Sequence, residues 1–213
     1  MMKRLFISGL LMVTLTSVSV EGAENGRGVY LGIGHAASFY NDGDYLKDEF
    51  QIDHLDGSDT GFVIYGGYQL DEILGIEASY TDYGKFNADQ KVSQASTAYT
   101  LAVNLGYSFL DGQLRPFTLL GLGYINTDYK NYPDTVTIDG RDYRVVDPDT
   151  RHTAFHYGLG IQYEPDLLIG FGVRLAYEGS IYILSMEQAT DSSETNYYGQ
   201  NLGALYLSLQ YKF

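Results

Sequence analysis

The sequence predicts an all-β protein that folds as one eight-stranded antiparallel up-and-down transmembrane β-barrel. Three observations support this fold: a secretory leader, eight segments in which apolar and polar residues alternate, and connections that alternate between short and long. Alternation with a period of two is typical of a strand with two different faces. A soluble sandwich turns its polar face outward, whereas a membrane barrel turns it into the lumen and leaves the apolar face in lipid. The leader and the connections favour the membrane barrel.

The N-terminus predicts a cleaved signal peptide over residues 1–22, followed by a barrel domain over residues 23–213. Lys3 and Arg4 form a positive region, residues 5–20 form an apolar region, and small residues follow, so we expect cleavage after Gly22, with Ala23 as an alternative end point. The apolar run is marginal for the ~20 residues of a membrane-spanning helix, and stop-transfer charges do not follow it. A mature chain in a membrane must then be a closed barrel, because lipid offers unpaired N–H and C=O groups no partner.

The composition fits this fold and excludes several functions. The chain has 25 glycines and 21 tyrosines but neither cysteine nor tryptophan, so it has no disulfide framework and no thiol chemistry. Glycine and tyrosine suit crowded barrel interiors and interfacial aromatic girdles. The formal net charge is −14, and loss of Lys3, Arg4 and Glu21 with the signal leaves 11 basic and 26 acidic residues. So acidic a protein is a poor candidate for binding nucleic acid, which attracts positive patches.

Each alternating segment is long enough for a tilted strand across a bilayer, which takes ~9–11 residues. The eight segments are residues 29–40, 61–70, 74–84, 96–109, 114–129, 152–163, 167–183 and 202–213. The short connections, rich in turn residues, are 71–73, 110–113 and 164–166, and the long ones are 41–60, 85–95, 130–151 and 184–201. Asp and Glu concentrate in the long connections. This pattern predicts tight periplasmic turns and four acidic extracellular loops, as in a multi-pass barrel of the Gram-negative outer membrane.

The two faces of the predicted strands differ in charge. On one face, residues such as Leu101, Leu122, Ile169 and Phe171 are apolar, and no residue that we assign to it is charged. A bilayer enforces this absence, because Arg or Lys at its midplane costs ~2–4 kcal/mol. The opposite face carries polar residues and glycines, Gly170 among them, which make room for larger side chains because eight strands enclose little space. We therefore expect a packed polar interior rather than an open channel.

Several short motifs follow one another in an order that resembles the transmembrane domain of OmpA-type outer-membrane proteins. They are Gly-Gly-Tyr-Gln-Leu at 66–70, Gly-Ile-Glu at 75–77, Asn-Leu-Gly-Tyr at 104–107, Gly-Leu-Gly-Ile-Gln-Tyr at 158–163, Arg-Leu-Ala-Tyr at 174–177 and Leu-Tyr-Leu-Ser-Leu-Gln-Tyr-Lys-Phe at 205–213. The resemblance covers essentially all of the mature chain and implies an eight-stranded barrel. The family's peptidoglycan-binding domain has no counterpart in the sequence, so a role in tethering the cell wall is not expected. Tyr211 and Phe213 are expected to form the C-terminal assembly signal.

Glu77 and Arg174 are the only oppositely charged pair that we place in mid-strand on the lumen face. Buried opposite charges are tolerated when paired, and loss of one partner costs ~3–5 kcal/mol. The resemblance implies another role, because an interior carboxylate–guanidinium pair at matching positions is regarded as a gate in OmpA-type barrels. The family pattern has a lysine where this chain has Asn104 and an acid where it has Gln162. Glu77 then lacks the alternative partner of a switching gate, and we expect a static salt bridge.

No catalytic residue, metal site or cofactor is predicted. His35 and Ser38 have opposite parity on one strand, while His152 and His156 share a face without an accompanying nucleophile motif. Acidic pairs at 42–44 and 147–149 offer oxygen ligands but lack the spacing of a dedicated calcium loop. We expect these carboxylates to be solvated on the outer surface or bridged by divalent ions to lipopolysaccharide.

Three functions remain open from the sequence. The first is a structural outer-membrane protein whose loops contact host or environmental surfaces, in adhesion or colonisation. The second is a narrow, low-conductance pore for small solutes, and the third, the least favoured, is a lipid-modifying enzyme. The expected partners are outer-membrane lipid and lipopolysaccharide, the barrel-assembly machinery and a surface ligand held by the loops. The protein is expected to be a monomer.

Overall fold

The computed structural model describes residues 27–41, 56–57, 60–88, 92–130, 135–138, 140–145, 151–188 and 191–213. The predicted signal peptide lies outside these residues. Within them the chain forms strands joined by turns, and no helix there is long and apolar enough to cross a membrane.

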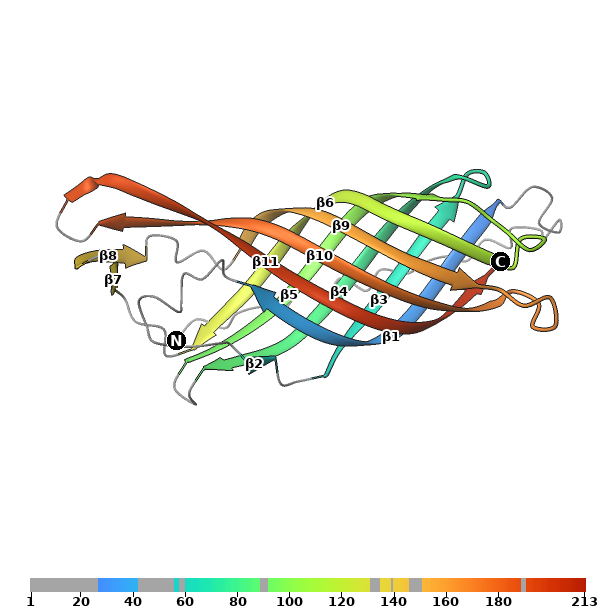
Figure 1. Ribbon diagram of the computed structural model, residues 1–213, viewed down its shortest axis with the longest axis horizontal. Coiled ribbons are helices and arrows are strands. Elements are labelled where there is room, and N and C mark those ends of the chain that lie inside the picture. Colours follow the sequence, from blue (N-terminus) through green and yellow to red (C-terminus); the bar gives the residue numbers. More distant parts are fainter. Residues whose placement is uncertain are drawn as a thin grey trace, which may run out of the picture.

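The barrel consists of eight long strands, each antiparallel to its neighbours (Figure 1). They are β1 (Gly28–Asn41), β3 (Thr60–Gln69), β4 (Leu74–Ala88), β5 (Val92–Gly106), β6 (Leu114–Lys130), β9 (Arg151–Tyr163), β10 (Phe171–Gln188) and β11 (Asp191–Lys212). Strand β11 pairs with β10 on one side and with β1 on the other, which closes the sheet. A closed sheet presents no unpaired edge to lipid. The predicted all-β, eight-stranded barrel is confirmed.

Three short strands lie at the end of the barrel with the long connections, which we name the loop end; the opposite end is the turn end. Strand β2 (Asp56–Gly57) pairs with β4, while β7 (Thr135–Ile138) and β8 (Arg141–Val145) form a hairpin whose second strand pairs with β10. Ile138 pairs with Arg141, and Gly140 between them has a φ of 74°, which glycine adopts without strain. The Asp-Gly sequence at 139–140 is a strong hairpin signal inside the connection that we expected to be an irregular loop.

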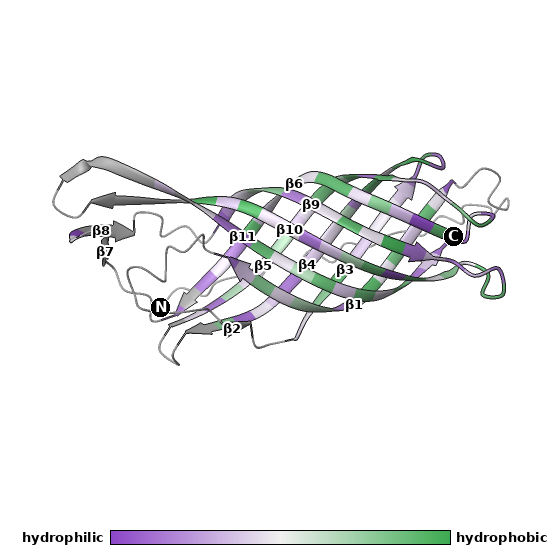
Figure 2. Cartoon of the chain, viewed as in Figure 1, coloured by the Kyte–Doolittle hydropathy of each residue, from purple (hydrophilic) through white to green (hydrophobic). Residues whose placement is uncertain are grey.

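The exposure of the side chains confirms the two expected faces. Leu101, Leu122 and Phe171 are 60%, 64% and 55% exposed, whereas Glu77 and Arg174 on the opposite face are buried. Hydrophobic and hydrophilic residues follow one another along the barrel strands in Figure 2. An apolar surface of this extent is unusual on a soluble monomer and is what lipid requires.

The expected strand boundaries are wrong at two turns. Strand β5 ends at Gly106 rather than at residue 109, and β10 begins at Phe171 rather than at residue 167. Ile169, expected on the lipid face, and Gly170, expected in the lumen, belong to a turn in which Gly170 has a φ of 78°. The turn contains three consecutive apolar residues, Leu-Leu-Ile at 167–169, which imitate the apolar content of a strand. Local composition therefore misplaced the start of β10.

At the loop end the strands are longer than expected. Most of residues 85–95 and 184–201, expected to be loops, continue β4, β5, β10 and β11. A strand outside the bilayer needs no apolar face, so its hydrogen-bonded ladder continues after the alternating pattern has ended.

Glycines in the lumen make room for tyrosines that cross it. A Cβ atom at Gly32 would overlap the ring of Tyr65, and a Cβ atom at Gly67 would overlap the hydroxyl of Tyr30. The two rings are buried, with centroids 6.3 Å apart. The glycines of this face are thus spatial requirements of the tyrosines on neighbouring strands.

We expect Gly32→Val to destabilise the barrel by about 1–3 kcal/mol, because a side chain inserted into a packed core displaces its neighbours, here Tyr65. Urea unfolding in lipid vesicles, followed by heat-modifiable gel mobility, measures the change. Gly199→Val is the matched control, since a Cβ atom there meets nothing within 4 Å. Equal stability of the two variants would contradict this account.

Candidate functional site

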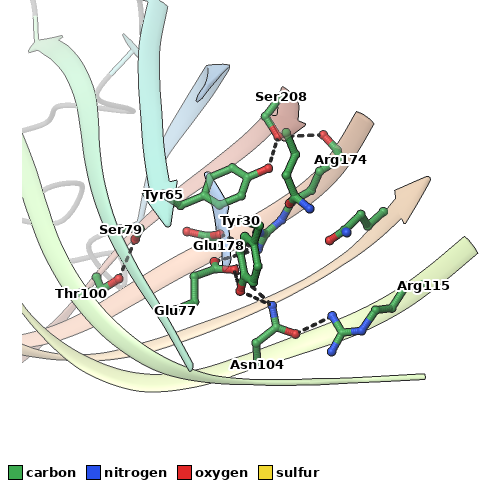
Figure 3. A network of polar contacts seen from close by, with 12 residues as sticks. Tyr30, Tyr65, Glu77, Ser79, Thr100, Asn104, Arg115, Arg174, Glu178 and Ser208 are labelled. Atoms are coloured by element: carbon green, nitrogen blue, oxygen red, sulfur yellow. Dashed lines mark hydrogen bonds and ion pairs between the residues drawn. The ribbon is translucent and has the colours of Figure 1, made fainter. Parts of the chain in front are cut away.

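An ion pair spans the lumen between β4 and β10 (Figure 3). Arg174 donates from Nη1 to Oε2 of Glu77 at 2.8 Å and from Nη2 to Oε1 at 2.9 Å. The Arg174 side chain is 0% exposed and the Glu77 side chain is 2% exposed. A bidentate geometry of this kind gives both strength and direction to a charge pair.

The two charged groups are enclosed by further partners. Glu77 also accepts hydrogen bonds from Tyr30 at 2.7 Å and from the Asn104 amide at 3.1 Å. The guanidinium carbon of Arg174 lies 4.1 Å from the ring centroid of Phe117, 4.2 Å from that of Tyr65 and 5.7 Å from that of Tyr206. Cation–π contacts of this kind contribute more when the cation is desolvated. Side chains thus fill the lumen at the level of the ion pair.

A second buried carboxylate, Glu178, lies beside the pair and was missed from the sequence. Its Oε1 atom is 3.6 Å from Nη2 of Arg174 and accepts a hydrogen bond from the hydroxyl of Tyr206. Its Oε2 atom is 3.6 Å from Nε2 of His156. The expectation that Glu77 and Arg174 are the only opposite charges in the lumen is therefore wrong. The signal was present, since Glu178 has the same parity as Arg174 on one strand.

Arg115, at the start of β6, is a second buried cation that the sequence analysis also missed. It donates from Nη1 to Oδ1 of Asn104 at 2.8 Å and from Nη2 to the backbone carbonyl of Ile73 at 3.3 Å. Asn104 therefore bridges Arg115 to Glu77, in the position for which the family resemblance implied a lysine. A second basic group is present near Glu77, but it reaches the carboxylate through an amide.

Gln162, the other expected polar residue of the lumen, lies toward the turn end. Its amide and that of Gln210 both donate to Oε1 of Glu164, the second at 3.0 Å. Gln162 and Glu164 line a hollow of about 700 Å³ together with Arg115 and Lys212. Gln162 therefore takes part in closing the turn end and does not contact the ion pair in any hydrogen bond described here.

The lumen histidines lie in positions that do not support hydrolysis. His156 lies 3.2 Å from Oγ of Ser180 and 3.6 Å from Glu178, so a serine, a histidine and a glutamate are adjacent. Ser180 is 0% exposed, and Tyr83 donates to the same hydroxyl at 3.3 Å. A nucleophile must reach its substrate, and this one is enclosed by protein. The network serves packing, as does the stacking of His152 on Tyr182, whose ring centroids are 5.0 Å apart.

The expected acidic ligands at 42–44 and 147–149 lie outside the described residues. Within the part of the chain that the structure describes, no group of three or more His, Asp or Glu residues is arranged to hold a metal ion.

Tyr211 and Phe213 lie on the outer wall at the turn end, at the seam where β11 meets β1. The ring of Tyr211 contacts Phe171 with centroids 4.8 Å apart and Phe213 with centroids 5.0 Å apart. The Phe213 amide donates to the carbonyl of Val29 at 2.9 Å, which extends the closing ladder by one residue. Their role as an assembly signal remains a prediction.

Comparisons with known proteins agree with this architecture. A family model described as "outer membrane protein beta-barrel domain" matches residues 8–213. Among solved structures, the attachment invasion locus protein Ail of Yersinia pestis is 19% identical, with a TM-score of 0.50, over 87% of this chain and 99% of that chain. The outer membrane protein OprG of Pseudomonas aeruginosa is 12% identical, with a TM-score of 0.51, over 89% of this chain and 97% of that chain. No curated protein matches the sequence. At these identities the structural likeness establishes the fold alone.

We expect Arg174→Ala to destabilise the barrel by about 3–5 kcal/mol, because it leaves Glu77 and Glu178 buried without their cation. Adding Glu77→Gln to this variant recovers part of the loss, since one uncompensated carboxylate is removed. Urea unfolding of the single and double variants measures the coupling. Arg141→Ala, at an exposed arginine of β8, is the control and changes stability by less than about 1 kcal/mol. The prediction is wrong if both arginine variants unfold alike.

Proposed function

Because this chain belongs to the outer membrane protein β-barrel domain family, we propose that it is a closed outer-membrane scaffold that holds a β-sheet platform outside the cell for contact with other surfaces. The platform consists of β7, β8, residues 184–188 of β10 and residues 191–198 of β11. This proposal separates a structural role for the barrel from an interaction role for its loop end.

The main support for the platform is the long β10–β11 ladder. It runs from Phe171 paired with Tyr211, at the turn end, to Gln188 paired with Asp191. Strand β8 adds to it through Met186, Glu187 and Gln188, and β7 adds to β8, so the sheet widens at the loop end. The β10–β11 hairpin extends well past the other strands of the barrel in Figure 1. Hydrogen-bonded strands hold a binding surface in place better than irregular loops do.

The packed lumen favours this proposal over a pore. The Glu77–Arg174 pair spans the interior, and aromatic rings of Phe117, Tyr65 and Tyr206 surround the guanidinium. A solute would have to break a bidentate ion pair and displace these rings. A low-conductance pore therefore requires a rearrangement, whereas display at the loop end requires none.

The charge of the chain favours a neutral or basic partner. One structural relative, Ail of Yersinia pestis, has been crystallised in complex with the heparin analogue sucrose octasulfate. Here the net charge is −14, and the platform sequence has four acidic residues, Asp142, Glu187, Asp191 and Glu194, against two basic ones, Arg141 and Arg144, which leaves it a net charge of −2. Like charges suppress association, so a sulfated polysaccharide fits this platform poorly and a basic protein surface fits it better.

We expect the purified protein to show no large conductance in planar bilayers, because its lumen is filled by its own side chains. Arg174→Ala is expected to lose stability without opening large currents. Single-channel recording with parallel urea unfolding checks both statements. Large, open currents in Arg174→Ala at unchanged stability would show a gate instead of a static pair.

We expect replacement of residues 131–150 by a short Gly-Ser linker to weaken attachment of expressing bacteria to extracellular-matrix proteins by about tenfold or more, equivalent to ~1.4 kcal/mol. The variant removes β7 and β8 while the barrel strands remain, which heat-modifiable mobility verifies. A Gly-Ser replacement of the turn at 110–113 is the control at the opposite end. Attachment that survives the first replacement, or that heparin increases, would contradict the proposal.

A further inference from the structure

The outer wall formed by β4, β5, β6 and β9 changes from apolar to polar along a sharp line. Tyr80, Tyr99 and Tyr124 form one row across three strands, since Tyr80 pairs with Tyr99 and Tyr99 pairs with Tyr124. The first two rings have centroids 5.0 Å apart, and Tyr99 and Tyr124 are more than half exposed. Toward the turn end the same face continues with Leu101 and Leu122. A tyrosine row above leucines marks the boundary between hydrocarbon and headgroups.

Polar residues begin directly beyond the tyrosine row, toward the loop end. Thr97 pairs with Asp82 on one side and with Asn126 on the other, and Asn126 pairs with Arg151. At the next outward-facing position of β5, Ala95 pairs with Lys85 of β4 on one side and with Asp128 of β6 on the other. Four strands thus present hydrogen-bonding and charged groups at the level of the lipid headgroups.

This polar zone is hollowed. The register of β4 against β5 shifts between Asp82 and Lys85, where Gly84 has a φ of 72° and its amide donates to Oδ1 of Asp82 at 2.8 Å. Such a bulge bends its strand and re-aims the side chains around it. The hollow beside it has a volume of about 680 Å³. Its lining residues are Thr60, Asp82, Lys85, Thr97, Asn126 and Asp128, with nearby backbone.

We infer that this hollow binds the phosphorylated disaccharide headgroup of the glycolipid that forms the outer leaflet, with acyl chains lying over the tyrosine row. A ligand at this place must be amphiphilic, because the tyrosine row that borders the hydrocarbon lies directly next to the polar residues of the hollow. The volume lies within the range of small-molecule sites and accommodates a sugar headgroup. Threonine hydroxyls, the Asn126 amide and carboxylates match sugar hydroxyl and amide groups, which both donate and accept hydrogen bonds.

The placement of the cations favours a headgroup with two separated phosphates. Lys85 on β4 lines the hollow, and Arg151 on β9 pairs with Asn126, which also lines it; both basic side chains are exposed. Asp82 and Asp128 line the hollow as well, so its acidic and basic charges balance, in contrast to the net charge of −14 of the whole chain. Three strand spacings of ~4.8 Å separate β4 from β9, or about 14 Å along the wall. A phospholipid carries one compact phosphate and reaches one cation at a time, whereas a bisphosphorylated disaccharide reaches both. Arginine and lysine are the side chains suited to phosphate at an interface.

The inference is independent of the proposed function, because it concerns the barrel wall at the membrane surface and not the platform. Loss of attachment and loss of glycolipid binding are therefore separable in the same set of variants.

Native mass spectrometry of the detergent-purified full chain tests the inference with three probes: bisphosphorylated lipid A, monophosphoryl lipid A and phosphatidylglycerol of matched chain length. The wild type is expected to retain the bisphosphorylated lipid most tightly. The double variant Lys85→Ala/Arg151→Ala is expected to bind it about 30-fold more weakly, since each basic residue at a membrane surface contributes roughly a fivefold factor. Its affinity for phosphatidylglycerol is expected to change much less.

Two matched variants separate the hollow from general charge effects. Asn126→Leu keeps every charge but extends the apolar wall into the polar zone, so it weakens lipid A binding while heat-modifiable mobility shows a folded barrel. The control Arg141→Ala/Arg144→Ala removes the same charge from β8 and leaves lipid A affinity unchanged. Equal wild-type affinity for lipid A and phosphatidylglycerol, or full lipid A binding by the Lys85/Arg151 double variant, would overturn the inference.

Discussion

The bidentate contact between Glu77 and Arg174 organises the interior of this barrel. A buried charge must be paired and must find hydrogen-bond partners, and here the partners come from several different strands. Glu77 accepts hydrogen bonds from Tyr30 on β1 and Asn104 on β5. Asn104 in turn accepts one from Arg115 on β6. Aromatic rings from β3, β6 and β11 pack against the guanidinium of Arg174. Glycines on the same face then supply the space that these large side chains occupy. One ion pair thus fixes side chains on most of the wall.

The membrane sets the complementary constraint on the outside. Because lipid solvates neither charge nor an open strand edge, the sheet must close and its outer face must be apolar over the thickness of the bilayer. The lipid outside and the packed interior act on alternate residues of the same strands, which is why apolar and polar residues alternate so clearly in this sequence. The strands, their order, the parity of Leu101 and Leu122 and the inward position of Glu77 and Arg174 could all be predicted for this reason.

What the sequence did not predict lies where these constraints weaken. The start of β10 was misplaced because apolar residues in the preceding turn imitate a strand. The platform was expected to be loops because strands outside the bilayer carry no alternation. Glu178 and Arg115 are different cases. Their parity would have placed them in the lumen, but they were not assigned to it. Which interior side chains touch depends in addition on strand stagger and rotamers, and neither follows from spacing along the chain. Asn104 pairs with Leu119 on β6, so its contact with Arg115 depends on the reach of the arginine side chain.

A barrel filled by its own side chains must meet its ligands on the outside, and here two outer surfaces differ in charge. The platform is acidic in sequence, as is the whole chain, whereas at the hollow on the wall Lys85 and Arg151 balance the carboxylates of Asp82 and Asp128. Charges further apart than about 8–10 Å are largely screened at physiological salt, so the distant carboxylates of the platform do not decide binding at the wall. Contact charges do. An acidic protein can therefore repel a sulfated polysaccharide at its platform and still hold a phosphorylated lipid at the hollow beside the tyrosine row, because each surface responds to the charges within its own Debye length.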